Sequence, residues 1–154
     1  MGNVFELQHA LVDHYLSIAR DRQSTQEEFA ASFNYLGQIL AVEMTREFSG
    51  DVKVVQTPLE ATQGFCLHTS IALVPILRAG LALVDAFVEL LPTSVVLHLG
   101  MYRNEETVEP VWYYNKLDEH TPVDLALILD PMLATGGSVV AAIGALRKFG
   151  VPKV

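Results

Sequence analysis

Near the amino terminus, apolar residues recur at the spacing of an α-helix. One helical face carries Leu7, Leu11, Tyr15 and Ile18. This spacing predicts a first helix that ends near residues 20–23. A second helix is predicted to begin after it, because Ser24 with Glu27 fits a capping box. Thr25 with Glu28 fits one equally well, and the apolar stripe that follows consists of Phe29, Phe33, Leu36 and Leu40.

Beyond residue 50 the pattern changes to short runs rich in β-branched residues. These runs are VKVVQT at 52–57, IALVPI at 71–76, VVLHLG at 95–100 and VDLALILD at 123–130. Runs without polar alternation are typical of strands covered on both faces, as in a parallel sheet. Helices are predicted over 80–91 and 138–150. Strands alternating with helices predict an α/β fold with right-handed crossovers.

Two further stretches extend this prediction. WYYNKL at 112–117 is interpreted as a strand whose aromatic residues pack on the core, in preference to a stacking platform for bases. GVPKV at 150–154 is interpreted as the start of the next parallel strand. The chain of 154 residues, 51% of them hydrophobic, suits one domain, with N-terminal helices in 1–49 and an α/β core in 50–154.

Charge and cysteine content narrow the classes of function. Ten Lys and Arg against eighteen Asp and Glu give a formal net charge of −8, which disfavours binding to nucleic-acid backbone and favours small ligands. Cys66 is the only cysteine, so no internal disulfide can form, and it is interpreted as a buried packing residue. The most apolar region, 71–91, is interrupted by Arg78 and Asp85, which argues against a membrane span. No leader sequence is recognisable, and a soluble cytoplasmic protein is predicted.

Candidate chemistry lies where predicted strands end. Arg78, Ala79 and Gly80 follow one strand directly and precede a helix. In open parallel sheets, ligands bind outside the carboxyl ends of the strands. A small-residue loop lets an oxyanion approach the backbone, and the arginine offers a planar fork of donors to phosphate. An ordinary connection with a surface arginine is an equally good interpretation of this loop alone.

The second such loop follows the last predicted strand. Thr135, Gly136, Gly137 and Ser138 begin a helix, so their backbone N–H groups can converge on a phosphate at its positive end. Asp130 lies at the strand tip, too far along the chain to touch the same phosphate, and could accept hydrogen bonds from sugar hydroxyls. A carboxylate for hydroxyls and amides for phosphate together indicate a cradle for ribose 5-phosphate. The five histidines show no metal-ligand spacing and no pairing with a nucleophile.

The stretch DPMLATGGS at 130–138 resembles the phosphoribosyl diphosphate (PRPP) signature of type I phosphoribosyltransferases, in the variant of the uracil phosphoribosyltransferase family. Three other segments agree with that family in sequence and order: HALVDHYLSIARD at 9–21, LVPILRAGL at 73–81 and GMYRNEETVEPVWYYNKL at 100–117. The resemblance implies the three-layer parallel sheet of type I phosphoribosyltransferases.

It also implies roles for individual positions. The diphosphate loop falls on Arg78, Ala79 and Gly80, and a mobile hood falls on 102–110, with Arg103 reaching PRPP. The cradle for the ribose and its 5-phosphate consists of Asp130, Pro131, Met132, Leu133, Ala134, Thr135, Gly136, Gly137 and Ser138. Arg78, Arg103 and Asp130 are the implied catalytic residues. Mg²⁺ is the implied cofactor, held through PRPP and not by a protein metal site.

The implied reaction transfers the phosphoribosyl group of PRPP to uracil and gives UMP and diphosphate. The family's C-terminal uracil-binding segment, rich in Gly, Pro and Asp, has no counterpart in the sequence, so the sheet is expected to be shortened at its C-terminal side. A non-catalytic PRPP-binding or regulatory module and an inactive structural fragment therefore stay open as alternatives. The resemblance further suggests a homo-oligomer and names GTP as a candidate effector.

Overall fold

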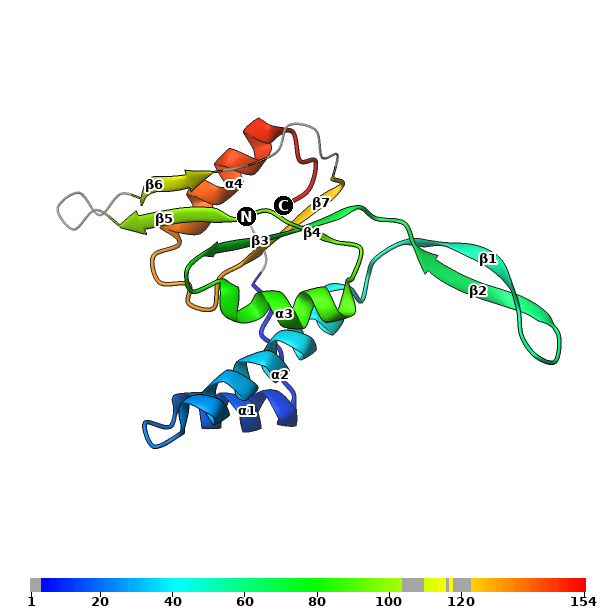
Figure 1. Ribbon diagram of the computed structural model, residues 1–154, viewed down its shortest axis with the longest axis horizontal. Helices are drawn as coiled ribbons and strands as arrows, with labels where there is room; N and C mark the ends of the chain where they lie inside the picture. The colour runs from blue at the N-terminus through cyan, green and yellow to red at the C-terminus, as the bar shows by residue number, and fades with distance from the viewer. Residues whose placement is uncertain (1–3, 104–109, 116, 118–122) are drawn as a thin grey trace.

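The computed structural model describes residues 4–103, 110–115, 117 and 123–154. Its helices are α1 (Ala10–Arg20), α2 (Gln26–Met44), α3 (Leu81–Leu90) and α4 (Gly137–Phe149). Its strands are β1 (Gly50–Gln56), β2 (Ala61–Leu67), β3 (Ile71–Leu77), β4 (Val95–Val96), β5 (Leu99–Arg103), β6 (Pro110–Asn115) and β7 (Leu125–Leu129). Figure 1 shows a layered body, a pair of helices beside it, and a hairpin of β1 and β2 that projects into solvent.

Strand β3 lies at the centre of the main sheet. It pairs in parallel with β7 along one edge and with β4 and β5 along the other, and β6 continues the sheet by antiparallel pairing with β5. An isolated parallel bridge joins Lys153 to Leu125 on the outer side of β7. This bridge agrees with the prediction that the residues around 150–154 begin another parallel strand.

Helices cover both faces of this sheet, which confirms the predicted three-layer α/β architecture (Figure 1). On one face, Ala142 and Leu146 of α4 pack in a buried cluster with Val74, Ile76 and Leu99 of the sheet. On the other face, the α3 residues Leu83 and Phe87 belong to a second buried cluster. Every residue from Ile71 to Ile76 is buried, because helices lie on both sides of β3.

Helix α2 begins at a true capping box. The Thr25 hydroxyl accepts from the Glu28 N–H at 3.2 Å, and the Glu28 carboxylate accepts from the Thr25 N–H at 2.7 Å. The Thr25–Glu28 alternative is therefore the correct one. Helix α2 then packs on α3 through Gly37, where an added Cβ would lie 2.8 Å from the Ala86 Cβ. The predicted apolar stripe is only partly buried, since Phe29 and Leu40 remain exposed while α1 covers another side of α2.

The hairpin corrects two predictions. The sequence predicts the run 52–57 inside a parallel sheet, yet β1 pairs antiparallel with β2. None of the four described helices covers it, so Val52 and Val54 are 67% and 70% exposed. Cys66 lies in β2 and is half-buried, not buried. The β2 run ATQGFCL contains too few β-branched residues to be recognised as a strand from sequence.

Two further differences concern the outer strands. The single strand predicted over 95–100 is divided into β4 and β5. Both pieces keep the same register against β3, and the gap between them lies opposite Val74 and Pro75, whose ring leaves no N–H for the ladder. The aromatic residues of β6 were expected on the core. Instead Tyr113 and Tyr114 are 54% and 40% exposed, because α4 covers only one face of this part of the sheet.

Candidate functional site

The two predicted loops meet at the carboxyl ends of β3 and β7, which are neighbouring parallel strands (Figure 1). Gly80 is buried between them. A Cβ built on Gly80 would overlap the Leu129 carbonyl oxygen and would lie 2.6 Å from the Ile76 nitrogen. Only glycine therefore allows the loop after β3 to lie against the last residue of β7. Since Asp130 follows Leu129 directly, this contact sets the two loops side by side.

Within the first loop, the three predicted residues are placed differently. Arg78 and Ala79 are exposed, and the peptide bond between Leu77 and Arg78 is cis. The Gly80 N–H donates to the Ile76 carbonyl at 2.8 Å. That amide is thus used within the fold, and Gly80 serves the site through close packing. Arg78 and Ala79 are the residues of this loop that solvent, and hence a ligand, can reach.

The second loop ends at the amino terminus of α4. Gly136 caps the helix in the left-handed conformation, with φ +76°, and no side chain caps it. The Val140 N–H donates to the Gly136 carbonyl at 2.9 Å. The N–H groups of Gly137, Ser138 and Val139 precede that bond and have no acceptor within the helix. The first turn carries no acidic residue, so the positive end of the helix dipole is not neutralised there.

Space is open beside the two glycines at the start of α4. A Cβ added at Gly137 would meet only the Thr135 Oγ1, at 3.8 Å, and one at Gly136 only the Leu133 Cδ1, also at 3.8 Å. Such distances are ordinary van der Waals contacts. Neither glycine is therefore enclosed by other parts of the chain, which leaves the start of α4 approachable.

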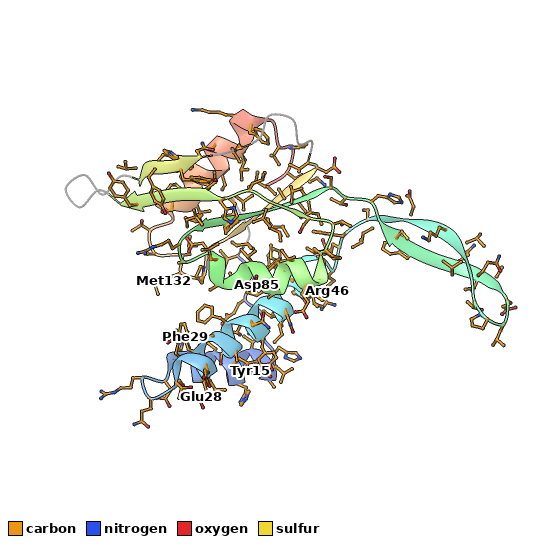
Figure 2. All side chains as sticks on the ribbon, viewed as in Figure 1. Tyr15, Glu28, Phe29, Arg46, Asp85 and Met132 are labelled. Atoms are coloured by element: carbon orange, nitrogen blue, oxygen red, sulfur yellow. The ribbon has the colours of Figure 1, made fainter. Side chains whose placement is uncertain are left out.

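Asp130 lies half-buried at the end of β7. Its Oδ1 accepts a hydrogen bond from the Met132 N–H at 3.2 Å, which holds the turn after the strand. Its Oδ2 makes no hydrogen bond to any residue of the described part of the chain, so this oxygen can accept from a ligand. Between the acid and the helix, Met132 and Leu133 are 78% and 68% exposed, Ala134 and Thr135 are exposed and Pro131 is half-buried. Met132 is labelled in Figure 2.

Arg103 ends strand β5, where its Cα pairs with Pro110 of β6. The predicted hood covers 102–110, and residues 104–109 lie outside the described part of the chain. The sequence interpretation missed Val139, whose amide joins those of Gly137 and Ser138 at the start of α4. The sequence could have indicated Val139, because the first turn of any helix leaves three or four amides unpaired.

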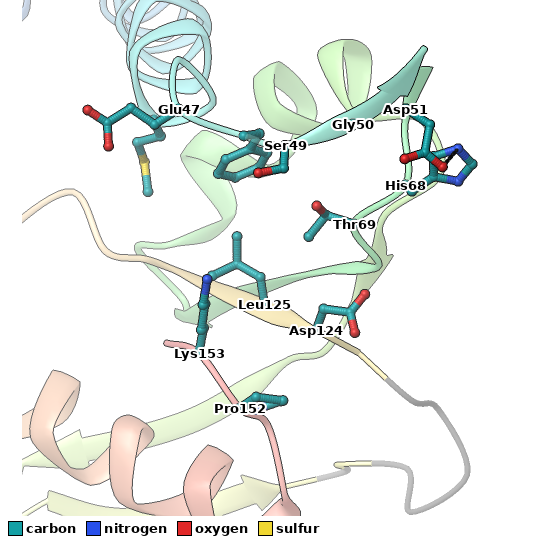
Figure 3. Close-up of a pocket in the computed structure, with 12 residues that line it drawn as sticks. Glu47, Ser49, Gly50, Asp51, His68, Thr69, Asp124, Leu125, Pro152 and Lys153 are labelled. Carbon is teal, nitrogen blue, oxygen red and sulfur yellow. Dashed lines mark ion pairs between the residues drawn. The ribbon is translucent and has the colours of Figure 1, made fainter. Parts of the chain in front are cut away.

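A cavity of about 720 Å³ lies at the opposite, amino end of the same strands (Figure 3). It is lined by the start of β7, the base of the hairpin, the end of α2 with the segment after it, and the C-terminal residues Pro152 and Lys153. Across its rim the His68 Nε2 lies 3.1 Å from the Asp51 Oδ2, and the Asp124 Oδ2 accepts from the Ser70 N–H at 2.9 Å. None of the residues predicted to bind PRPP lines this cavity.

The described part of the chain has no metal site of its own. Its residues include no cluster of three or more His, Cys, Asp or Glu side chains that could hold a metal ion. Their helices also include none whose length and apolar character would allow it to cross a membrane.

The arrangement at the carboxyl edge, with two loops side by side and free helix amides, is typical of open α/β proteins that bind small ligands there. Comparison with known proteins then identifies the family. The family model described as uracil phosphoribosyltransferase matches residues 6–154. The chain belongs to the uracil phosphoribosyltransferase family.

Individual relatives agree with this assignment. The chain is 44% identical over 154 residues to the uracil phosphoribosyltransferase of Roseiflexus castenholzii, covering 100% of the chain and 74% of that protein. It is 40% identical over 155 residues to that of Streptococcus equi subsp. zooepidemicus, with the same coverage. Among solved structures, the AQ2163 protein from Aquifex aeolicus superposes with a TM-score of 0.87 at 35% identity, covering 97% of this chain and 72% of that one.

Proposed function

We propose that the protein transfers the 5-phosphoribosyl group of PRPP to uracil, giving UMP and diphosphate. The observation that carries this proposal is the pairing of an open helix start with an acid at the tip of the adjoining strand. Family membership supports the same reaction. We further propose that residues 1–154 form one domain, with the N-terminal helices in 1–49 attached to the α/β core in 50–154.

The cradle would hold the ribose 5-phosphate part of PRPP. The free N–H groups of Gly137, Ser138 and Val139 would bind the 5-phosphate at the positive end of α4. The Oδ2 of Asp130 would accept hydrogen bonds from the ribose hydroxyls, while its Oδ1 stays bonded to the Met132 N–H. Pro131 to Thr135 would shape the wall between phosphate and sugar. Every residue of the predicted stretch 130–138 thus takes part in binding the phosphate or the ribose, or in shaping the wall between them.

The diphosphate would lie toward the first loop. Arg78 is exposed beside the end of β7, so its guanidinium can reach a group bound next to Asp130. Ala79 leaves room for a phosphate to approach the backbone, and Arg103 would approach the same group from β5. Departure of diphosphate leaves positive charge on the sugar ring and negative charge on the leaving oxygens. Fixed cationic donors stabilise the second of these charges, and the attacking group is a ring nitrogen of uracil.

Mg²⁺ is the proposed cofactor, and it would neutralise part of the charge on the diphosphate. The phosphate oxygens of PRPP suit a hard cation, because Mg²⁺ prefers oxygen ligands and is usually bound in large part through substrate phosphates. The ion would be held through the oxygens of PRPP, and Asp130 keeps its role toward the ribose hydroxyls. No protein cage is proposed.

Three finer proposals concern partners and location. The chain spans 74% of the length of its curated relatives, and we assign no residue of it to the uracil ring. GTP as an effector and a cytoplasmic location are proposed from the family resemblance alone. A homo-oligomer is proposed with additional support from the β1–β2 hairpin.

The hairpin carries an apolar strip on one face. Val52 lies opposite Phe65, and Val54 and Leu67 continue the same face, with exposed fractions of 67%, 61%, 70% and 47% respectively. A two-stranded hairpin with such a face is marginally stable in water unless something covers it. A second copy of the chain would cover it. Val54→Asp should shift the protein toward monomer in sedimentation equilibrium, whereas Thr62→Asp, which adds the same charge to the opposite face, should not.

The reaction is tested directly with isotope-labelled uracil, PRPP and Mg²⁺. Labelled UMP should form with the wild-type chain and should fall sharply with Arg78→Ala. Calorimetry with PRPP and Mg²⁺ separates the alternatives, since PRPP binding without UMP would indicate a binding module. A chain that binds neither substrate would be a structural fragment, and the proposal would be wrong.

A further inference from the structure

Two tyrosines form a pair on the uncovered face of β5 and β6. The ring centroids of Tyr102 and Tyr113 lie 6.4 Å apart with an interplanar angle of 27°. Their side chains are 55% and 54% exposed, so neither contributes to a core cluster. Burial therefore does not explain the pair. The pair lies instead beside a residue of the proposed site, because Tyr102 directly precedes Arg103 at the end of β5.

A β-bulge produces this pair. Gly100 lies opposite Tyr114, whereas the next residue of β5, Met101, lies opposite Trp112. Tyr113 is consequently the extra residue on β6, with no partner on β5. Bulges bend a strand and redirect one side chain, and they are frequent beside functional sites. Here the redirected side chain is the ring of Tyr113.

Gly100 makes room for that ring. A Cβ built on Gly100 would lie 2.6 Å from Tyr113 Cε2 and 2.7 Å from Tyr114 Cβ. Any other residue at position 100 would push the ring of Tyr113 away from the strand. Glycine in a strand otherwise weakens it, so its presence here fits a close approach of the ring to the backbone.

The bulge also fixes the register of the last pairs of β5. Beyond it, Tyr102 lies opposite Val111 and Arg103 opposite Pro110. A slip by one residue would turn each side chain of the strand to the other face of the sheet. The ring of Tyr113, placed over Gly100 and against Tyr102, opposes such a slip at the two residues that precede Arg103.

We propose that Tyr113 is a positioning residue: through its contacts with Gly100 and Tyr102 it holds the end of β5 in the register from which Arg103 serves PRPP. This inference rests on the proposed function, and it goes beyond it by assigning a role to a residue outside both loops. Tyr113 itself does not contact the substrate. Its ring is the active part, and its hydroxyl is not required.

Three variants test this role. Tyr113→Ala removes the ring, Tyr113→Phe keeps it, and Tyr114→Ala removes a neighbouring exposed ring while keeping the Cβ that faces Gly100. Calorimetry with PRPP and Mg²⁺ should give a dissociation constant raised about tenfold for Tyr113→Ala, equal to ~1.4 kcal/mol, and near the wild-type value for the other two. Amide hydrogen exchange at Tyr102 and Arg103 should accelerate in Tyr113→Ala alone.

The outcomes separate this inference from the proposed function. If the wild-type chain binds PRPP and Tyr113→Ala binds it equally well, the positioning role is wrong and the cradle stands. Equal losses in Tyr113→Ala and Tyr114→Ala would also overturn it, because they would reflect general damage to β6. A wild-type chain that does not bind PRPP overturns both proposals, and hydrogen exchange then reports only whether the ring holds the strand.

Discussion

The carboxyl and amino ends of the central sheet are formed by the same strands, yet they offer a ligand different things. At the carboxyl end, Gly80 brings two loops together, and α4 presents amides with no helical acceptor. At the amino end there is a cavity of about 720 Å³, whose rim carries Asp51, Asp124 and His68. The carboxyl end has the donors that suit an anion. Directed donors, and not the volume of a cavity, therefore identify the candidate site.

The largest effect on stability is expected at Gly80, which brings the two loops of the carboxyl end together. Gly80→Ala would force backbone atoms of Ile76 and Leu129 apart, so the free energy of unfolding should fall by about 3 kcal/mol, the upper range for overpacking. Gly144→Ala is the matched control, since nothing lies within 4 Å of an added Cβ there. Urea denaturation measures both. A Gly80→Ala protein as stable as wild type would show that the two loops are not in contact.

Loss of PRPP binding is expected next, from Gly137→Val. The side chain would enter the open space beside Gly137, where an added Cβ meets only the Thr135 Oγ1 at 3.8 Å, so the fold should persist while the phosphate is excluded. Gly144→Val places the same side chain on the same helix, away from the cradle. Circular dichroism and calorimetry with PRPP distinguish the two effects. Wild-type affinity in Gly137→Val would contradict the placement of the 5-phosphate.

A graded effect is expected from Arg78→Ala. Removing the guanidinium should weaken PRPP binding by about 1.5 to 3 kcal/mol, the usual range for a hydrogen bond to a charged group. Arg147→Ala, in the last turn of α4, is the matched loss of one positive charge. Calorimetry at two salt concentrations measures the difference. Equal affinities of the two variants would remove Arg78 from the site.

At the amino end, Asp124→Ala should separate stability from binding. The Asp124 carboxylate accepts from the Ser70 N–H and so ties the start of β7 to the start of β3. Its loss should lower the free energy of unfolding by about 1 kcal/mol, since the side chain is exposed. The affinity for PRPP should stay unchanged. A weakened affinity would mean that the two ends of the sheet are coupled.

The smallest effect is expected from Arg46→Ala, at the end of α2. The hydrogen bond from the Arg46 guanidinium lowers the pKa of Glu43, and both side chains are solvent-exposed. A lowered folded-state pKa means that the pair stabilises the protein above the unfolded pKa of Glu43 and loses this contribution as the pH falls through the folded value. The stability difference between wild type and Arg46→Ala should therefore shrink on acidification, in denaturation curves recorded from pH 7 to pH 3. A difference that grew would contradict the ion pair.

The sequence predicted the core strands well and the outer strands poorly. The run 71–76 has no polar residue, and it is buried throughout because helices cover both faces of β3. The run 52–57 is also rich in valine, yet it lies in the exposed hairpin. Local composition indicates an extended strand in both cases. Whether a helix covers the strand depends on tertiary packing, which composition does not encode.

In the candidate site, too, the sequence predicted the local features but not those that depend on tertiary packing. The motif 130–138 identified an acid followed by a glycine-rich helix start, and the structure has Gly136 and the free amides where the motif predicted them. The motif could not reveal that the Gly80 amide is bonded to Ile76, because that bond depends on how closely the loop packs on β7. Nor could it reveal the bulge at Tyr113, which depends on the register between two strands. The assigned roles stay predictions for the experiments above.

The projecting hairpin has a thermodynamic consequence. None of the residues 50–56 and 61–67, all of which the structure describes, belongs to either core cluster. Within the chain its order rests on the pairing of β1 with β2, so the hairpin would gain from added packing against a partner. If a second copy supplies it, mass action makes the melting temperature rise with protein concentration, so that the abundance of the protein in the cell would help to set its own thermal stability.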